Sequence, residues 1–170
     1  MTAPTPLMAG KKGLIMGVAN DHSIAWGIAK ALAGAGAELA FTYQGEALGK
    51  RVKPLAESVG SSLVLPCDVE DLASVDGVFD TLRETWGKLD FVVHAIGFSD
   101  KNELKGRYAD TTRENFSRTM VISCFSFTEI AKRAAVGQLL LTHIPPWTSR
   151  EDVIAEAKAE FDGPVHAVLP

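Results

Sequence analysis

The sequence has little cysteine and no long apolar run, and each shortage excludes a class of protein. Its two cysteines, Cys67 and Cys124, follow no C-x-x-C spacing. Two cysteines that lie far apart exclude a disulfide framework and a zinc ribbon, and we predict two reduced, buried thiols. No apolar run approaches the roughly 20 residues of a membrane span, and the N-terminus lacks the order of a signal peptide. We therefore expect a cytoplasmic protein without a membrane partner.

An excess of basic charge is also missing. The net charge is −4, and the lysines and arginines are scattered among acidic residues. Because no basic stripe is available to a polyanion, we expect no nucleic-acid partner. The 170 residues, of which 46% are hydrophobic, suffice for one sizeable core. We therefore predict a single domain over residues 1–170.

Short apolar segments alternate with helical patterns along the chain. The segments typical of buried strands lie at 13–18, 37–43, 62–67, 89–97, 138–144 and 165–169. The patterns with apolar residues on one helix face lie at 24–32, 48–59, 75–86, 116–130 and 154–161. This alternation favours right-handed crossovers and a parallel sheet covered on both faces. It predicts a three-layer, doubly wound, Rossmann-like α/β fold with strand order 3-2-1-4-5-6.

The segment GVANDHSIAWGIAKALAGAG, residues 17–36, joins the first predicted strand to the first predicted helix. Backbone N–H groups are unpaired at a helix start and the helix dipole favours an anion there, so a phosphate fits this position. Gly17 permits a sharp turn or a positive φ, Ser23 offers a hydroxyl, and Gly27 lets the helix lie close to the sheet. Taken alone, the segment is equally consistent with a plain N-cap at Ser23 and a packing glycine at Gly27.

Three further strand ends carry groups suited to a nucleotide. Gln44 follows the second strand, where a dinucleotide fold presents a group to the adenosine ribose. Its amide favours NADH over NADPH, although Lys50 and Arg51 would suit a 2′-phosphate. Asp68 follows the third strand and either accepts a hydrogen bond from an adenine amino group or simply starts the next loop. Gly97 follows the fourth strand and lets the backbone approach a cofactor where the strand order reverses.

Four segments together resemble the enoyl-acyl-carrier-protein reductases of bacterial fatty-acid synthesis, a divergent branch of the short-chain dehydrogenases. They are GLIMGVANDHSIAWGIAKALAGAGAELAFTYQGE, LPCDV, WGKLDFVVHAIGFSDKNELKGRY and TTRENFSRTMVISCFSFTEIAKRA. The resemblance covers residues 8–134 of the chain. The G-x5-S-I-A-x-G turn and the HAIGF stretch are typical of that branch rather than of short-chain dehydrogenases at large.

The resemblance implies NAD(H) as the cofactor and an enoyl thioester on acyl carrier protein as the substrate. It also implies eight cofactor contacts, which touch the pyrophosphate, the adenosine ribose, the adenine and the nicotinamide ribose in turn. These contacts are Gly17, Ser23 and Ile24; Gln44; Asp68 and Val69; Ile96 and Gly97.

The catalytic pair of that family has no match in this sequence. In the family, a tyrosine stabilises the enolate and a lysine seven residues later holds the nicotinamide ribose, both beyond the fifth strand. The two tyrosines here, Tyr43 and Tyr108, both precede the fifth predicted strand. Lys50 lies seven residues after Tyr43, but this pair starts on the adenosine side. We therefore assign no catalytic residue and expect an enoyl reductase by lineage that binds NAD(H) without turnover. A working reductase and a metal-dependent hydrolase are the alternatives.

Residues 136–169 resemble a different family. The segment VGQLLLTHIPPWTSREDVIAEAKAEFDGPVHAV is similar to the closing strand, helix and strand of a metallo-β-lactamase-fold hydrolase, in which the histidine matching His143 would ligate a metal. The chain has no H-x-H-x-D-H cluster, so we expect no metal site. Thr148 and Glu151 predict a capping box for the helix. We interpret the chain as chimeric or truncated, with reductase-like residues 1–134 and a divergent tail at 135–170.

Two segments leave alternatives open. The helix over 111–134 carries Phe116, Met120, Phe125 and Phe127. The resemblance places this helix at a subunit interface of a homo-oligomer, whereas the aromatic side chains are also consistent with plain core. The polar loop over 98–108 either borders a substrate opening or is solvated.

Overall fold

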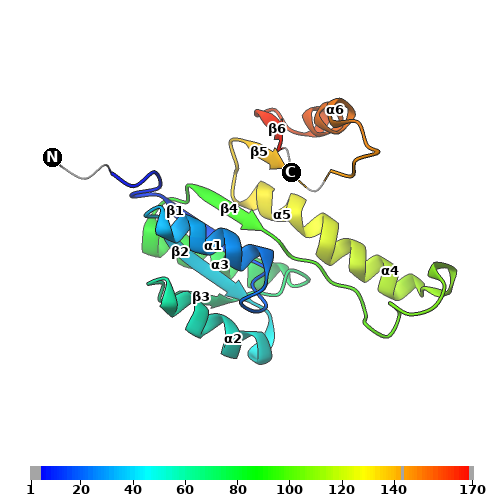
Figure 1. The fold of residues 1–170 in the computed structure, drawn as a ribbon, viewed down its shortest axis with the longest axis horizontal. Coiled ribbons are helices and arrows are strands. Elements are labelled where there is room, and N and C mark those ends of the chain that lie inside the picture. The colour runs from blue at the N-terminus through cyan, green and yellow to red at the C-terminus, as the bar shows by residue number, and fades with distance from the viewer. Residues whose placement is uncertain (1–4, 143, 169–170) are drawn as a thin grey trace. The chain divides into compact units, whose positions relative to one another are not determined.

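The computed structural model describes residues 5–142 and 144–168 and divides the chain into two compact units. The first unit is Met1–Ala134 and the second is Ala135–Pro170, blue to yellow and orange to red in Figure 1. His143, which was matched to a metal ligand, lies outside the described residues. The single domain over the whole chain stays a prediction.

A four-stranded parallel sheet forms the centre of the first unit. Its strands are β1 (Lys12–Met16), β2 (Glu38–Tyr43), β3 (Leu63–Pro66) and β4 (Phe91–His94), in the spatial order β3-β2-β1-β4. β1 is central, and its Leu14 lies opposite Ala40 of β2 and Val92 of β4. The predicted strands in this part of the chain and their order are therefore confirmed.

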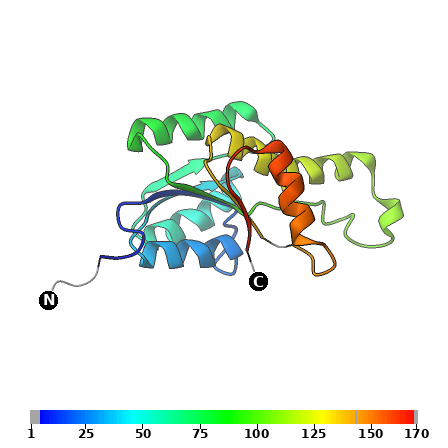
Figure 2. The ribbon, with the colours of Figure 1, turned by 90° about the horizontal axis from the view of Figure 1, so that it is seen from above.

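Helices cover both faces of this sheet, because successive side chains of β1 point to opposite sides. Leu14 and Met16 are fully buried in a core shared with α3 (Leu72–Trp86). Ile15 is buried on the opposite face, in a core shared with α1 (Ile24–Gly34) and α2 (Gly45–Ser58). Figure 2 shows the sheet between these two helical layers. The three-layer Rossmann-like architecture is confirmed for this unit.

A long helical segment packs on the same face as α3. It consists of α4 (Arg113–Met120), the π-helical η2 (Val121–Phe125) and α5 (Ser126–Arg133), and it follows the short η1 (Tyr108–Asp110). Ile122, Ser126 and Ile130 are buried at helical spacing. Cys124 lies between these buried positions and is exposed, whereas Cys67 is buried. The prediction that both thiols are buried is therefore wrong for Cys124.

A half-buried histidine joins β4 to this helical segment. His94 Nε2 lies 2.8 Å from Ser126 Oγ, and Ser126 Oγ donates to the Ile122 carbonyl at 2.7 Å. Since the serine proton is used there, His94 Nε2 must carry a proton and donate to Ser126. The Phe127 ring packs edge-on against the imidazole, with the ring centroids 5.8 Å apart. Burial lowers the pKa of His94 below 6.5 because the charged imidazolium is poorly solvated there.

The second unit consists of β5 (Leu139–Leu141), α6 (Arg150–Glu160) and β6 (Val165–Ala167). The two strands are parallel, with Leu140 opposite His166. Within the predicted order 3-2-1-4-5-6, the neighbours 3-2-1-4 are confirmed in the first unit and the neighbours 5-6 in the second. The pairing of β4 with β5, which would join the two units, stays a prediction. Because α6 connects the two strands as a parallel crossover, their backbone groups can hydrogen-bond each other within the unit.

The helix α6 begins one residue later than its sequence predicts. Ser149 caps it, with its hydroxyl accepting from the Asp152 N–H at 3.2 Å. The predicted capping box of Thr148 and Glu151 is therefore wrong, since a serine hydroxyl directly after the threonine takes the cap. Within residues 5–142 and 144–168, every helix is too short or too polar to span a bilayer.

The environment of His94 predicts a pH-dependent stability. The unfolded state binds a proton near pH 6.5 while the folded state resists it, so the free energy of unfolding falls as the pH drops below 6.5. His94→Gln keeps an N–H donor for Ser126 without a titrating ring and should flatten this dependence between pH 7 and pH 5. Urea unfolding at several pH values measures it, with exposed His22→Gln as the matched control.

The pH range of this experiment avoids a second titrating group. The backbone N–H of Lys12 and the side chains of Lys88 and Lys11 lower the pKa of Asp90 to about 2. The contribution of Asp90 to the free energy of unfolding is therefore lost only as the pH falls below about 3.8. A wild-type stability that does not change between pH 7 and pH 5 would contradict the half-buried, neutral state of His94.

Candidate functional site

The carboxyl ends of β1, β2 and β4 surround a cleft of about 170 Å³. Four of the predicted contact residues line it: Gly17, Gln44, Ile96 and Gly97. This edge of an open parallel sheet, next to the point where the strand order reverses, is the usual ligand-binding place of doubly wound folds. The structure therefore brings residues from three separate strand ends to one site.

Gly17 shapes the first turn of the cleft. Its φ is +100°, a backbone conformation that residues other than glycine rarely adopt. A Cβ atom at this position would lie 2.0 Å from the carbonyl oxygen of Ala95, which directly follows β4. Glycine is therefore required for two independent reasons, the backbone conformation and the close approach of the segment after β4.

The side chain of Ser23 stabilises the turn before α1 and does not cap the helix. Its hydroxyl oxygen accepts from the N–H groups of Ala19 and Asn20, both at 3.0 Å. It occupies the N-cap position of α1, but its side chain makes no bond to the helix backbone. The N–H groups of Trp26 and Gly27 donate to the Ser23 carbonyl. The N–H groups of residues 24 and 25 precede this first helical bond, so they are free to meet an anion.

Two residues of α1 have surroundings that the sequence did not indicate. The side chain of Ile24 is 62% exposed at the start of the helix. A Cβ atom at Gly27 would meet nothing within 4 Å. The prediction that Gly27 brings the helix close to the sheet is wrong, because Ala25 and Ala29 occupy the buried side of α1 and Gly27 is exposed.

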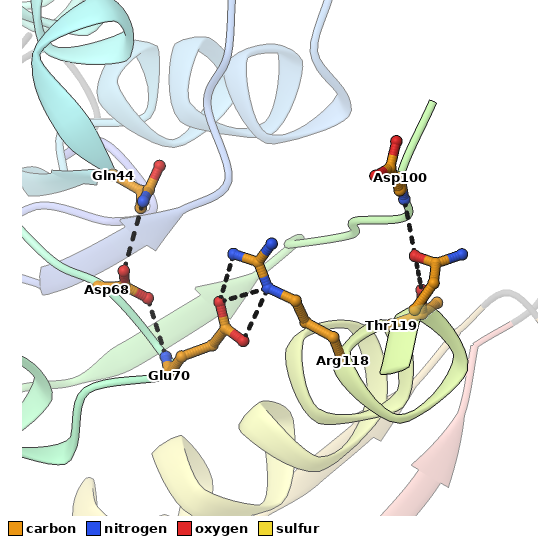
Figure 3. A network of polar contacts seen from close by, with 7 residues as sticks. Gln44, Asp68, Glu70, Asp100, Arg118 and Thr119 are labelled. Atoms are coloured by element: carbon orange, nitrogen blue, oxygen red, sulfur yellow. Dashed lines mark hydrogen bonds and ion pairs between the residues drawn. The ribbon is translucent and has the colours of Figure 1, made fainter. Parts of the chain in front are cut away.

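A hydrogen bond joins the residues that follow β2 and β3 (Figure 3). Gln44 Nε2 donates to Asp68 Oδ2 at 3.3 Å. The other carboxylate oxygen of Asp68 accepts from the Glu70 N–H at 3.0 Å, and the Asp68 N–H donates to Ser74 Oγ at 2.9 Å. Val69 is buried in the core. Asp68 therefore presents a fixed carboxylate beside Gln44, while the side chain of Val69 packs inward.

Cys67 and Tyr43 line the cleft but were not predicted as site residues. Burial and the nearby Asp68 and Asp71 raise the pKa of Cys67 to about 11, so its thiol is neutral at pH 7. Both residues lie where a strand ends or has just ended, and this position is the signal that could have identified them. Among the described residues, no group of three or more His, Cys, Asp or Glu side chains could hold a metal ion.

The tyrosines lie far from a catalytic arrangement. The Tyr43 ring packs on α2, where a Cβ atom at Gly49 would lie 2.7 Å from it and Lys53 Nζ lies 5.4 Å from its centroid. Tyr108 lies in η1 with 78% of its surface exposed. Tyr43 is the last residue of β2, next to Gln44, and Lys50 lies at an exposed position of α2.

Comparisons with known proteins point to one family. Residues 17–142 match the family model described as Enoyl-(Acyl carrier protein) reductase. The chain is 83% identical over 129 residues to enoyl-[acyl-carrier-protein] reductase [NADH] 2 of Rhizobium meliloti, covering 76% of this chain and 48% of that protein. It is 64% identical over 134 residues to reductase [NADH] 1 of the same organism, covering 79% and 49%. The chain thus spans about half the length of these curated relatives.

Solved structures agree with this result. The FabI crystal structure from Candidatus Liberibacter asiaticus aligns with a TM-score of 0.81 at 46% identity, covering 96% of this chain and 72% of that one. An enoyl-(acyl-carrier-protein) reductase from Anaplasma phagocytophilum, solved in complex with NAD, aligns with a TM-score of 0.76 at 57% identity. That alignment covers 84% of this chain and 56% of the solved one.

The two glycines at either end of the α1 turn should respond oppositely to alanine. Gly17→Ala should lower the free energy of unfolding by at least about 2 kcal/mol, because it combines a positive φ with a backbone clash. Gly27→Ala should raise it by about 0.5–1 kcal/mol, because it adds a helix former at an open, exposed position. Urea unfolding measures both values. Equal effects of the two variants would contradict the geometry of this turn.

Proposed function

Because the chain belongs to the enoyl-(acyl carrier protein) reductase family, we propose that its first unit binds NAD(H) in the cleft at the carboxyl ends of β1, β2 and β4. The function of its lineage is then the NADH-dependent reduction of an enoyl thioester on acyl carrier protein in fatty-acid biosynthesis. NADH, when bound, supplies the hydride. The residues of this chain supply binding and orientation.

The open space in front of Gly97 is the observation that carries this proposal. Gly97 lines the cleft, yet a Cβ atom there would meet nothing within 4 Å. The protein itself therefore does not require glycine at this position, whereas a ligand that approaches the backbone does. Gly17, in contrast, is required by its own turn. The two glycines support a cofactor that lies between the α1 turn and the segment after β4.

Each part of the cofactor has a matching group in this arrangement. The pyrophosphate is held at the start of α1, by Gly17, Ser23 and Ile24, where helix N–H groups are free. The adenosine lies toward Gln44 and Asp68, which hydrogen-bond each other. The nicotinamide ribose lies toward Ile96 and Gly97.

The pair of Gln44 and Asp68 favours NADH over NADPH. The Asp68 carboxylate lies 3.3 Å from the Gln44 amide, so a 2′-phosphate held by Gln44 would face a negative charge. Lys50 and Arg51 on α2 are exposed and provide the opposing attraction. We propose that repulsion by the Asp68 carboxylate outweighs the attraction by Lys50 and Arg51. NADH then binds more tightly than NADPH.

We propose further that this chain does not turn the substrate over. Tyr43 packs on α2 and Tyr108 is exposed in η1, so neither offers its hydroxyl to an enolate beside the nicotinamide. The loss of one oxyanion donor lowers a rate by about 10²–10³. The chain then holds the cofactor-binding half of the site without the tyrosine that stabilises the enolate.

The long helical segment supports self-association of the chain. Phe116, Met120, Val121 and Phe125 on α4 and η2 are each more than a third exposed. Exposed apolar patches of this kind mark interaction surfaces. In the family that the sequence resembles, this helix forms a subunit interface. We propose that a second copy of the chain covers this face.

The origin of the second unit is a separate proposal. The curated relatives match 129 and 134 residues, or 76% and 79% of the chain. The family model extends to residue 142, into the second unit. From the sequence resemblance alone, we propose a tail of different lineage, with the strand, helix and strand of a metallo-β-lactamase-fold hydrolase at residues 136–169. We propose no metal site in this tail.

Cofactor binding is tested by titration with NADH, followed by energy transfer from tryptophan. Gly97→Val should lower the NADH affinity by at least about tenfold, because its side chain enters the space reserved for the ligand. Its unfolding midpoint should stay at the wild-type value. The wild type should bind NADPH more weakly than NADH and should not oxidise NADH with a crotonyl thioester.

Gly77→Val is the matched control for this titration. A Cβ atom at Gly77 also meets nothing within 4 Å, but the residue is exposed on α3, outside the cleft. It should bind NADH like the wild type. Wild-type affinity in the Gly97 variant would sink the proposed site, and turnover by the wild type would overturn the proposed inactivity.

Self-association is tested by light scattering after gel filtration. The wild type should run above its chain mass of 18.2 kDa, and the double variant Phe116→Ser/Phe125→Ser should run as a monomer, because it removes apolar area from the proposed interface. Tyr108→Ser, which changes an exposed aromatic residue outside these helices, should leave the mass unchanged. A monomeric wild type would refute the interface.

A further inference from the structure

An ion pair links two segments that are 48 residues apart in the sequence (Figure 3). Arg118 Nε lies 3.0 Å from both carboxylate oxygens of Glu70, and Arg118 Nη2 lies 2.8 Å from Glu70 Oε2. Arg118 belongs to α4, whereas Glu70 lies in the loop between β3 and α3. A pair with several charge-assisted bonds fixes orientation as well as distance.

Glu70 continues directly to the adenosine side of the cleft. Its backbone N–H donates to Asp68 Oδ1, and the second oxygen of that carboxylate accepts from Gln44. Arg118 is therefore linked to Asp68 and Gln44 through Glu70, whose carboxylate meets Arg118 and whose backbone N–H meets Asp68. A shift of Glu70 would move one of the donors that hold the Asp68 carboxylate.

The same helix also holds the segment after β4. The Arg118 guanidinium lies 4.7 Å from the centroid of the Phe98 ring, directly after Gly97. One turn earlier, the buried Asn115 accepts from the Asp100 N–H at 2.9 Å. Arg118 therefore contacts both segments that border the cleft, the loop after β3 and the segment after β4.

Stability alone does not account for this pair. The side chains of Arg118 and Glu70 are 48% and 30% exposed, and exposed ion pairs contribute little to the free energy of unfolding. Two other exposed arginine pairs, Arg107 with Asp110 and Arg83 with Asp80, join residues only three apart, whereas Arg133 with Asp76 also joins two distant elements. The pair of Arg118 and Glu70 instead spans the sheet edge at which the cofactor is placed.

We propose that Arg118 and Glu70 are positioning residues for the adenosine half of the cofactor. They hold the Asp68 carboxylate in place before the ligand arrives, so less ordering is needed on binding. This inference rests on the proposed binding of NAD(H) in the cleft. It assigns no contact between either residue and the cofactor.

ADP-ribose, which carries the adenosine half without nicotinamide, is the probe for this proposal. In calorimetric titrations, Glu70→Gln should weaken its binding by roughly three- to tenfold, because the Asp68 loop must then be ordered on binding. Removing a negative charge near an anionic ligand would by itself strengthen binding. The sign of the change therefore separates positioning from a general charge effect.

Three comparisons make the test specific. Asp76→Asn breaks the pair with Arg133, which also joins two distant elements, and should leave the affinity for ADP-ribose within about twofold of the wild type. Reduced nicotinamide mononucleotide should bind the wild type and Glu70→Gln equally. Asp68→Asn/Glu70→Gln should bind ADP-ribose no more weakly than Asp68→Asn alone, since Glu70 acts through Asp68.

Arg118→Met provides an independent variant and should match Glu70→Gln. Arg118→Lys keeps the charge but not the planar guanidinium, so it should give an intermediate affinity. Wild-type or tighter ADP-ribose binding in Glu70→Gln and wild-type binding in Arg118→Met would overturn the positioning role. A wild-type chain that binds neither ADP-ribose nor NADH would instead refute the proposed function.

Discussion

The burial of β1 on both faces is the constraint on which the first unit depends. Leu14 and Met16 are enclosed by one helical layer, and Ile15 is enclosed by the other. Since β1 also pairs with β2 on one side and β4 on the other, its position fixes four neighbours at once. The turn that leaves it at Gly17 is thereby placed between the ends of β2 and β4, where the cleft forms.

The site is formed by backbone segments that lie close together more than by reactive side chains. Gly17 lets the turn touch the Ala95 carbonyl, and Ser23 holds that turn through two N–H groups. The polar atoms at the adenosine side belong to Gln44 and Asp68, which fix each other. Such an arrangement suits a ligand recognised along its length, and it places few demands on side-chain chemistry within this unit.

Local patterns predicted the strands and helices because apolar periodicity is a property of neighbouring residues. They predicted the turn at Gly17 for the same reason. They also predicted the neighbours β5 and β6, because two strands joined by one crossover helix usually lie side by side. In contrast, no sequence signal marks the bond between Arg118 and Glu70. Contacts across 48 residues become visible only after the chain is folded.

The outer edge of β4 has a consequence for handling the protein. Within the described part of the first unit, β4 pairs only with β1, so the other edge of this apolar strand has no strand partner from that unit. Natural proteins protect such edges because their free N–H and C=O groups recruit strands from other molecules. In a first unit prepared without residues 135–170, this edge is therefore where we expect aggregation to begin at high concentration. Its length of four residues restricts the process to short, weak contacts.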